Sequence, residues 1–533
     1  MRLPDSIWAL GLLSLASICS SPAFAQEQDD DGVDPAVDDL VDDAWASRSA
    51  LDAVMDEPEG EVLELSLEAA RAIGLTNDLR LQSLQEVVDA ARHREVGSWG
   101  AFDWVFNASG NLSESEADAS NIFDAGAGSI DSSSQDLSFG FDRAFSAGGS
   151  LSVSYNHNNT KTNSFFNLLE TANQDVLAAV YTRPLMRGAG GDYTTSLQGI
   201  AGLRWDRERE SFRLARQGIL VTVDMLYWDL VLAESQMSVA GSALDLALEQ
   251  LDRDRRRRAA GVATEVEVIQ DEATVARRIE GVLLAETNLR SAMDTLRSAI
   301  FPGVGADTWS VQLKSITQLP VPDGSSVGAD WQAEIDSSIS QRAEVRIAEL
   351  DLEIAKMQHE RTINEKEPLL DVLVQLSSQG YDASVSNAIE ETLTYEFPTL
   401  SAGLNFQLPM GNVALDREER AARAELRAAQ LGLDAQRSEV ATGLREALRR
   451  VRYQSEATRA ASKTRDAAQR LMEAERSRYE QGLSTNFQVL EFQQALVEAQ
   501  YAEQASRAAY GQALATLARE RGNAGESQGG QAP

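Results

Sequence analysis

Two very long helical regions constrain the fold of this chain more than any other feature. Helical character runs from about Tyr193 to about Ile300, and again from about Leu415 to Arg519. A helix from Arg204 to Ala260 alone would be about 85 Å long, because each residue adds about 1.5 Å. A helix of this length does not fit inside a compact domain, so we expect it to pack lengthwise against other helices, as in a coiled coil.

Each helical region has one break, and a single offset relates the two breaks. A shift of 221 residues places Gly261-Val262-Ala263-Thr264 on Gly482-Leu483-Ser484-Thr485. The same shift places Val268 on Val489 without a gap. The shared offset indicates an internal repeat. At each break the glycine allows a left-handed helix cap and the threonine begins the next helix, so each region is predicted to be a helical hairpin.

Segments with a period of two residues precede each of the two helical regions. In them, apolar residues alternate with Ser, Asn, Gln, Asp or Gly, which predicts strands with one apolar and one polar face. Residues 108–136 are rich in Ser, Asp, Gly and Asn without a period, so they are predicted to form a long loop. The clearest strand-like runs are Leu137–Phe141, Leu151–Tyr155, Leu177–Tyr181, Leu370–Leu376 and Leu400–Leu408.

These two-faced strands favour a membrane wall. No segment after the N-terminal region has 18 apolar residues in a row, so no transmembrane helix is expected and any membrane span must consist of strands. A barrel would place the apolar face in lipid and the polar face in a water-filled lumen. A soluble β-sandwich shows the same alternation. About four to six strands are too few to enclose an aqueous pore, so several chains would have to share a barrel.

The N-terminal residues predict a secretory signal peptide. Ile7–Ile18 is an apolar run of 12 residues, and the small-x-small stretch Ala23-Phe24-Ala25 follows it. The only cysteine, Cys19, is expected to leave with this signal. We divide the chain into a signal peptide (1–25), an acidic disordered leader (26–62), a first structural repeat (63–300) with its tip near 261, an irregular equatorial connector (301–330), a second structural repeat (331–520) with its tip near 482, and a disordered tail (521–533).

Charge and motif content argue against several classes of function. The chain has 83 acidic and 48 basic residues, a net charge of -35, which argues against nucleic-acid binding. A single cysteine and three widely separated histidines exclude a disulfide framework and argue against a zinc site. The sequence has no catalytic motif, P-loop or dinucleotide fingerprint, so we expect neither an enzyme nor a bound cofactor.

The order of elements (signal, helix, strands, long helical hairpin, then the same again) resembles the TolC-like outer-membrane efflux proteins over residues 63–520. Four local sequences carry the resemblance, and their order and spacing matter more than any one of them. They are Leu65-Ser66-Leu67-Glu68-Ala69-Ala70 through Asn77-Asp78-Leu79; Arg183-Pro184-Leu185-Met186-Arg187-Gly188; Tyr227-Trp228-Asp229-Leu230; and Arg478-Tyr479-Glu480-Gln481 continuing into the second break.

The resemblance implies an α+β membrane protein that works as a homotrimer. Each subunit would give about four strands to a shared 12-stranded β-barrel, and the helices would form a periplasmic α-barrel of coiled coils. The segment 137–176 has more strand character than this plan needs, so we expect an extended hairpin on the extracellular side. The location implied is the outer membrane of a Gram-negative-type bacterium, in contact with outer-membrane lipid and with a large periplasmic portion.

The function implied is a passive exit duct of a tripartite efflux pump or a type I secretion system. A periplasmic adaptor protein would join it to an inner-membrane pump or ABC transporter, which supplies the energy. A soluble periplasmic coiled-coil scaffold or adaptor is the alternative, and it would not need detergent for extraction.

The resemblance also assigns candidate site residues at the two breaks. The tips, Gly261, Val262, Ala263 and Thr264 with Gly482, Leu483, Ser484 and Thr485, would dock the adaptor. In the family, acidic residues shortly after the second tip can ring the tunnel mouth and select cations. The matching positions are Gln488, which departs from the acidic pattern, and Glu491; Glu267 and Asp271 lie at similar depth in the first repeat. A solvated helix face is the alternative for each of them.

Overall fold

A computed structural model describes residues 62–118, 129–164, 168–303, 309–322 and 331–523, all within one compact unit, Glu59–Pro533. The predicted signal peptide and nearly all of the predicted leader lie outside the described residues. So does the predicted tail beyond residue 523.

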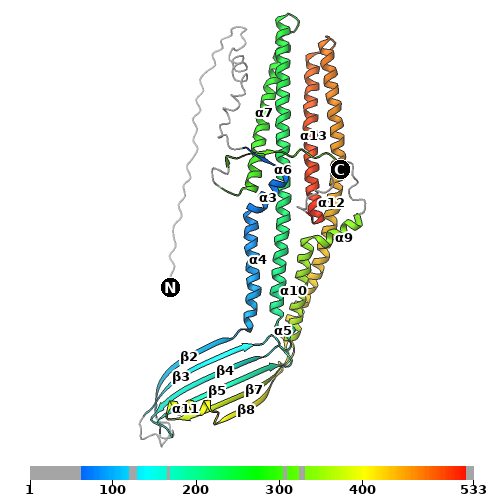
Figure 1. Ribbon diagram of the computed structural model, residues 1–533. Coiled ribbons are helices and arrows are strands. Elements are labelled where there is room, and N and C mark those ends of the chain that lie inside the picture. Colours follow the sequence, from blue (N-terminus) through cyan, green and yellow to red (C-terminus); the bar gives the residue numbers. More distant parts are fainter. Residues whose placement is uncertain (1–61, 119–128, 165–167, 304–308, 323–330, 524–533) are drawn as a thin grey trace, which may run out of the picture. The chain divides into compact units, whose positions relative to one another are not determined.

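Two helical hairpins form the long part of this unit (Figure 1). The first consists of α6 (Ser196–Ala259) and α7 (Glu265–Ile300), and the second of α12 (Val413–Glu480) and α13 (Asn486–Arg521). The boundaries that flank the two tips, and the ends of α7 and α13, differ by the 221 residues of the sequence offset. At about 1.5 Å per residue, α6 and α12 are each roughly 100 Å long.

Shorter helices extend the bundle toward the sheet (Figure 1). Ser66 caps α3 (Leu67–Asn77), and Asp78 caps α4 (Leu79–Ser98), which packs along α6. In the second repeat α10 (Ala343–Glu365) packs on both α6 and α12. The remaining short helices are η1 (Trp99–Phe102), α5 (Gly191–Thr194) and α9 (Trp331–Gln341). Among the described helices, none is long and apolar enough to pass through a bilayer.

A small parallel sheet of two strands lies beside the middle of α6. It pairs β1 (Val62–Leu65) with β6 (Gln312–Ser315), which belongs to the connector predicted to be irregular. Tyr227 of α6 is fully buried here; its hydroxyl donates a hydrogen bond to the Leu65 carbonyl at 2.9 Å. The Tyr227-Trp228-Asp229-Leu230 sequence therefore contributes to the core that joins α6 to the connector.

The large sheet has six antiparallel strands in the order β2-β3-β4-β5-β7-β8. A helix that the sequence did not predict, α11 (Val385–Leu393), connects β7 to β8 and packs on β7 and β5. The strands are β2 (Val105–Asp118), β3 (Ser129–Ala144), β4 (Ser150–Thr162), β5 (Thr171–Pro184), β7 (Leu369–Asp382) and β8 (Pro398–Gln407).

This sheet corrects two sequence predictions. The expected contribution of about four strands is wrong, because the first repeat alone provides four and the described chain provides six. The long loop predicted over 108–136 is also wrong, since β2 continues to Asp118 and β3 begins at Ser129. Small and polar residues such as Ser109, Gly110 and Ser113 hid the period of two, because on these strands one face is polar throughout and the other face turns polar toward the far end.

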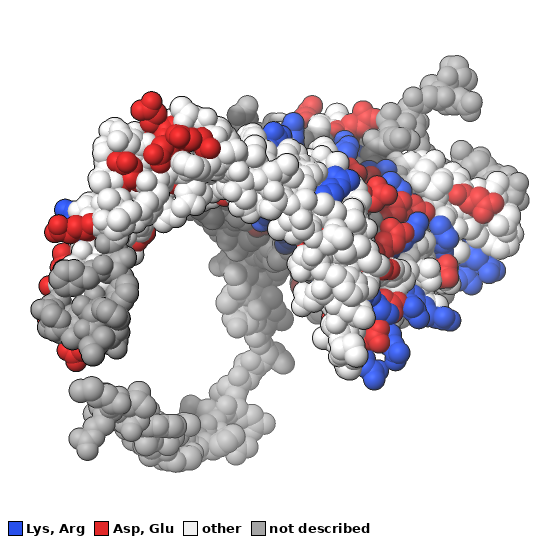
Figure 2. Space-filling view, turned by 90° about the horizontal axis from the view of Figure 1, so that it is seen from below, with Lys and Arg blue, Asp and Glu red and all other residues white. Residues whose placement is uncertain are grey.

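The two faces of the sheet differ sharply in chemistry. The strand register places Phe106, Phe141, Val153, Ala179, Leu376 and Leu400 in one row on the apolar face. Side chains on the opposite face form polar pairs between β2 and β3, including Ser109 with Ser138 at 2.7 Å and Ser113 with Ser134 at 2.8 Å. Seen from the sheet end, the described residues form a curved wall with large areas that carry no charged side chain (Figure 2).

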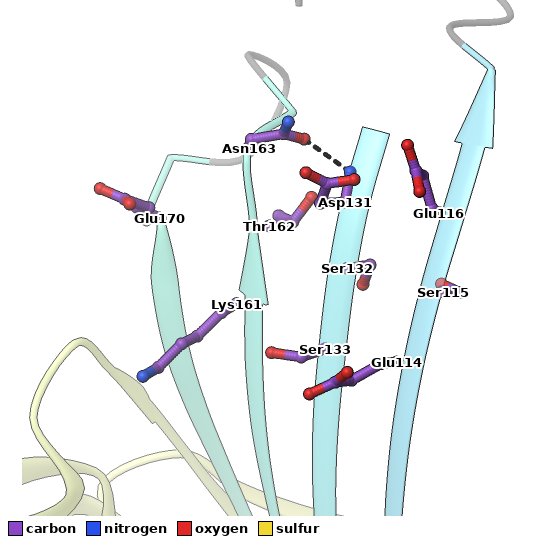
Figure 3. A pocket seen from close by; sticks show the side chains of 10 residues that line it. All are labelled: Glu114, Ser115, Glu116, Asp131, Ser132, Ser133, Lys161, Thr162, Asn163 and Glu170. Atoms are coloured by element: carbon purple, nitrogen blue, oxygen red, sulfur yellow. Dashed lines mark hydrogen bonds between the residues drawn. The ribbon is translucent and has the colours of Figure 1, made fainter. Parts of the chain in front are cut away.

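At the end of the sheet farthest from the helical hairpins, β2 and β3 are polar on both faces. A pocket there is lined by residues of β2, β3 and β4, by Asn163 just after β4 and by Glu170 just before β5 (Figure 3). Within it the Asp131 backbone amide donates a hydrogen bond to the Asn163 side chain at 3.0 Å. The lining includes the four acids Glu114, Glu116, Asp131 and Glu170 and a single base, Lys161. The apolar face therefore covers only part of the strand length, and hydrophilic strand ends extend beyond it.

Candidate channel entrance at the hairpin tips

The two hairpin tips have the same backbone geometry. Gly261 and Gly482 have φ angles of 73° and 74°, in the left-handed region where a glycine avoids the strain of a side chain. The Val262 amide donates to the Arg257 carbonyl at 2.9 Å, and the Leu483 amide donates to the Arg478 carbonyl at 2.9 Å. These bonds satisfy carbonyl groups that the ends of α6 and α12 would otherwise leave unpaired.

The helices after the tips begin at threonine caps. The Thr264 hydroxyl accepts a hydrogen bond from the Glu267 amide, and the Glu267 carboxylate accepts one from the Thr264 amide at 2.7 Å. Thr485 accepts a hydrogen bond from the Gln488 amide at 3.4 Å. The sequence therefore correctly placed both turns and both helix starts.

Each tip exposes a pair of apolar side chains. Val262 and Val266 are 67% and 62% exposed at the first tip, and Leu483 and Phe487 are 65% and 64% exposed at the second. Val266 and Phe487 were missed as site residues. Both lie one helical turn after an apolar tip residue, and the 221-residue offset relates them, so the repeat itself carried the signal.

A buried polar network joins the two hairpins just behind the tips. Asp254 of α6 is fully buried, and both of its carboxylate oxygens accept from the Tyr479 hydroxyl of α12 at 3.1 Å. Gln250, one turn earlier on α6, donates to Asp254 at 2.7 Å. The Arg257 guanidinium lies 3.3 Å from Asp254 and 4.6 Å from the centre of the Tyr479 ring.

The network continues into the helices that follow the tips. The Asn486 amide of α13 donates to the Asp271 carboxylate of α7 at 2.7 Å, and its carbonyl oxygen accepts from Gln250 at 3.1 Å. All four long helices therefore take part in one set of hydrogen bonds. Burial raises the pKa of the Tyr479 phenol, and the Asp254 carboxylate raises it further, so this hydroxyl remains a donor.

Asp271 is the member of the network whose hydrogen bonding is incomplete. It is 1% exposed, and one of its carboxylate oxygens is buried without a hydrogen-bond partner. Burial raises the pKa of Asp271 to about 7; the Asn486 amide opposes the shift, while the Asp254 and Glu267 carboxylates add to it. The protonated form therefore fits the folded network better than the ionised form does.

The raised pKa predicts a pH-dependent link between the hairpins. Because the folded pKa lies above the ordinary value of 3.8, the stabilisation is complete below that value and disappears as pH rises through about 7. Conductance through the candidate entrance should therefore rise between about pH 5.5 and 8.5, roughly 1.5 units on either side of the pKa. Asp271→Asn, which stays neutral, should hold the low-pH conductance throughout. An unchanged pH profile in this variant would contradict the role of Asp271.

The predicted entrance residues lie in different surroundings. Gln488 and Glu491 are exposed on α13, and Gln488 accepts a hydrogen bond from the Ser484 hydroxyl at 2.9 Å. Glu267 is half-buried in the helix cap, whereas Asp271 lies inside the network between the hairpins. Only Glu491 is both acidic and exposed, so it is the residue we keep as a selectivity candidate. Within the described ranges, no group of three or more His, Cys, Asp or Glu side chains could hold a metal ion.

Four members of the network were not predicted from the sequence. Gln250, Asp254, Tyr479 and Asn486 come from three helices, and the Tyr479–Asp254 bond joins residues 225 positions apart. The available hints were an acid inside an arginine-rich run, Arg253 to Arg258, and a tyrosine three residues before Gly482. Neither hint identifies its partner.

Comparison with known proteins agrees with this architecture. Residues 329–523 match the sequence model of a family described as outer membrane efflux protein. No curated protein matches the chain.

Solved structures match over most of the chain at low sequence identity. The CmeC outer membrane channel of Campylobacter jejuni is 14% identical, with 95% of this chain and 94% of that chain covered and a TM-score of 0.60. The outer membrane protein VceC of Vibrio cholerae is 14% identical, covering 86% of this chain and 96% of that chain, also with a TM-score of 0.60. The MtrE outer membrane channel of Neisseria gonorrhoeae, in its open state, is 16% identical. The match covers 86% of this chain and 89% of that chain, with a TM-score of 0.58.

The two helical hairpins and the two-faced sheet belong to a fold that this chain shares with these solved outer-membrane proteins. The family match over residues 329–523 and the shared fold together confirm the resemblance to the TolC-like outer-membrane efflux proteins seen in the sequence. The soluble scaffold or adaptor is therefore not favoured.

Proposed function

We propose that three copies of this chain form an exit duct from the periplasm through the outer membrane. The observation that carries this proposal is the six-stranded sheet, whose apolar and polar faces suit lipid and water and whose two edge strands lack partners within the described chain. The hairpins, roughly 100 Å long by helical rise, would continue the lumen into the periplasm. Export would be passive, driven by an inner-membrane pump or ABC transporter reached through an adaptor.

Channel measurements test this function directly. The purified protein should require detergent for extraction from the outer membrane and should form discrete conducting channels in planar lipid bilayers. Recovery of the protein in the soluble periplasmic fraction, with no conductance, would contradict the proposal.

The tips are proposed to bind the adaptor through their apolar side chains. The Leu483→Asp variant places a charge in this contact, and a central contact residue typically contributes about 2 kcal/mol, or roughly 30-fold in affinity. Cells carrying Leu483→Asp should therefore accumulate a fluorescent efflux dye, while the channel itself still conducts in bilayers. Leu483→Met, which keeps an apolar surface, is the matched control. Normal dye efflux in the aspartate variant would exclude this docking role.

Glu491 is proposed to favour cations at the tunnel entrance. In a trimer three copies of this exposed carboxylate would face one pore and attract cations. In a salt gradient, Glu491→Gln should shift the reversal potential toward zero, the value expected for a pore without ion selectivity. The neighbouring Gln494→Glu, on the same helix, tests whether any added charge acts in this way. A reversal potential that is unchanged by Glu491→Gln would assign the selectivity elsewhere.

A further inference from the structure

We propose that the barrel has eighteen strands, six from each of three chains, and that β8 of one chain pairs with β2 of the next with Gln407 opposite Val105. This inference rests on the proposed trimeric duct and deepens it. It replaces the 12-stranded wall that the sequence resemblance implied.

The first observation is that β2 and β8 are open edges. Both strands are exposed along their whole length, including Leu112 and Leu404, which are 79% and 73% exposed. An unpaired edge exposes backbone donors and acceptors, and lipid offers them no partners. The occupant of each edge is therefore another copy of the same sheet.

The second observation is the direction of the edge strands. β2 begins at the helix side of the sheet, directly after η1, and β8 returns to that side and ends shortly before α12. With an even number of strands in each chain, β8 of one chain runs antiparallel to β2 of its neighbour. The alternation that holds within one chain then continues around the whole ring.

The third observation is the register. Within one chain the ladder leads from Val105 across the sheet to Ser401. If the next chain joined at this level, only residues 398–401 of β8 would find partners on β2. A shift of six residues places Gln407 opposite Val105 and Pro398 opposite Glu114, so that the whole of β8 is paired.

The chemistry of the facing residues selects this register. It places Phe406 opposite Phe106, Leu404 opposite Ala108 and Leu400 opposite Leu112 on the apolar face. On the polar face it places Asn405 opposite Asn107, Gly403 opposite Ser109 and Ser401 opposite Asn111. An odd shift would mix the two faces. A shift of eight would move the Glu114 carboxylate from its place opposite Pro398 to one opposite Leu400.

The geometry of a closed barrel agrees with this register. Each of the three joints between chains shifts the register by six residues. Spread over the six strands of each chain, this shift gives a stagger of one residue for each strand. With a rise of about 3.3 Å per residue and a strand spacing of about 4.8 Å, the strands tilt by about 35°. This value lies at the edge of the range of roughly 35–45° found in outer-membrane barrels. At the same tilt the backbone diameter grows from about 22 Å for twelve strands to about 34 Å for eighteen.

The consequence concerns the size of cargo. The polar lumen of this wall would be roughly half again as wide as that of a twelve-stranded barrel. The outer-membrane section would then admit bulkier cargo than a twelve-stranded barrel of the same tilt.

Paired cysteines test the register. The chain has one cysteine, Cys19, which lies in the predicted signal peptide, so engineered pairs need no further changes. Ser401→Cys combined with Asn111→Cys should form disulfides between chains, because facing residues lie within the reach of a disulfide. The matched controls combine Ser401→Cys with Ser109→Cys or Ser113→Cys, which displace the second thiol by about 6.8 Å along the strand.

Non-reducing denaturing gels should show bands of two and three linked chains for the Ser401/Asn111 pair, with at least several-fold less product from either control. No product, a stronger product from a control, or a disulfide within one chain would overturn the proposed joint. Bilayer conductance of the same proteins separates the two proposals. If the Ser401/Asn111 double-cysteine protein forms conducting channels but no disulfide between chains, the duct stands and the eighteen-stranded register is excluded. If the protein without engineered cysteines forms no conducting channels, the duct itself is excluded.

Discussion

Tyr479→Phe is expected to open the proposed tunnel entrance. The phenol is the hydrogen-bond donor from α12 to the fully buried Asp254 of α6, so its loss removes the bond that joins these two helices. A hydrogen bond to a charged group contributes about 1.5–3 kcal/mol, which corresponds to a roughly 10- to 100-fold shift toward separated hairpins. Single-channel conductance in planar bilayers should therefore rise, with longer open periods than in the unmodified protein.

Another tyrosine on the same helix provides the control. Tyr453 of α12 is 69% exposed, so Tyr453→Phe should leave the conductance unchanged. Asp254→Asn should resemble Tyr479→Phe in direction, since it weakens the same bond from the other side. Equal conductance in the two tyrosine variants would mean that the network does not hold the entrance closed.

Leu404→Arg is expected to prevent stable assembly in the outer membrane. Leu404 lies on the apolar face of β8, with Val372 of β7 as its neighbour across the sheet. An arginine on the lipid side of a barrel costs about 2–4 kcal/mol near the middle of the bilayer. In a trimer this cost is incurred three times. The amount of folded trimer recovered from outer membranes should fall about tenfold or more.

The next residue along the strand provides a matched control. Asn405 faces the polar side of the same strand, opposite Asp371, so Asn405→Arg adds the same charge on the lumen side. That variant should assemble normally and change only the selectivity of the pore. If the two arginine variants assembled equally well, the assignment of the apolar face to lipid would be wrong.

The sequence predicted the hairpins well because their signals are local. A glycine with a positive φ angle and a threonine cap need only a few neighbouring residues, and the 221-residue offset supplied an independent check at Gly261 and Gly482. The helices are also long enough for their period to be clear. The positions of the two tips could therefore be predicted from the amino-acid sequence alone.

The number of strands could not be predicted from the sequence, for a physical reason. In the proposed barrel a strand needs an apolar face only where it would meet lipid, and β2 and β3 extend well beyond their apolar part into polar ends such as Glu116 and Asp131. There both faces are polar, and the period of two disappears. The extended hairpin expected from 137–176 lay in the right part of the chain, and the structure shows it as additional strands of the large sheet.

The buried network was beyond the reach of sequence analysis for a different reason. Helical periodicity shows that Asp271 and Asp254 can lie on a face, but it does not show which helix covers that face. Asp271 was predicted at the tunnel mouth, whereas its carboxylate accepts from Asn486 inside the bundle. Only the packing of one hairpin on the other brings these groups together.

The mass of the purified protein in detergent tests the central claim most directly. The account holds that chains with open-edged sheets become stable in lipid only by sharing one wall. Light scattering corrected for bound detergent should give the mass of three processed chains, stable on dilution. A particle with the mass of one chain, or a protein that remains dissolved without detergent, would contradict the account.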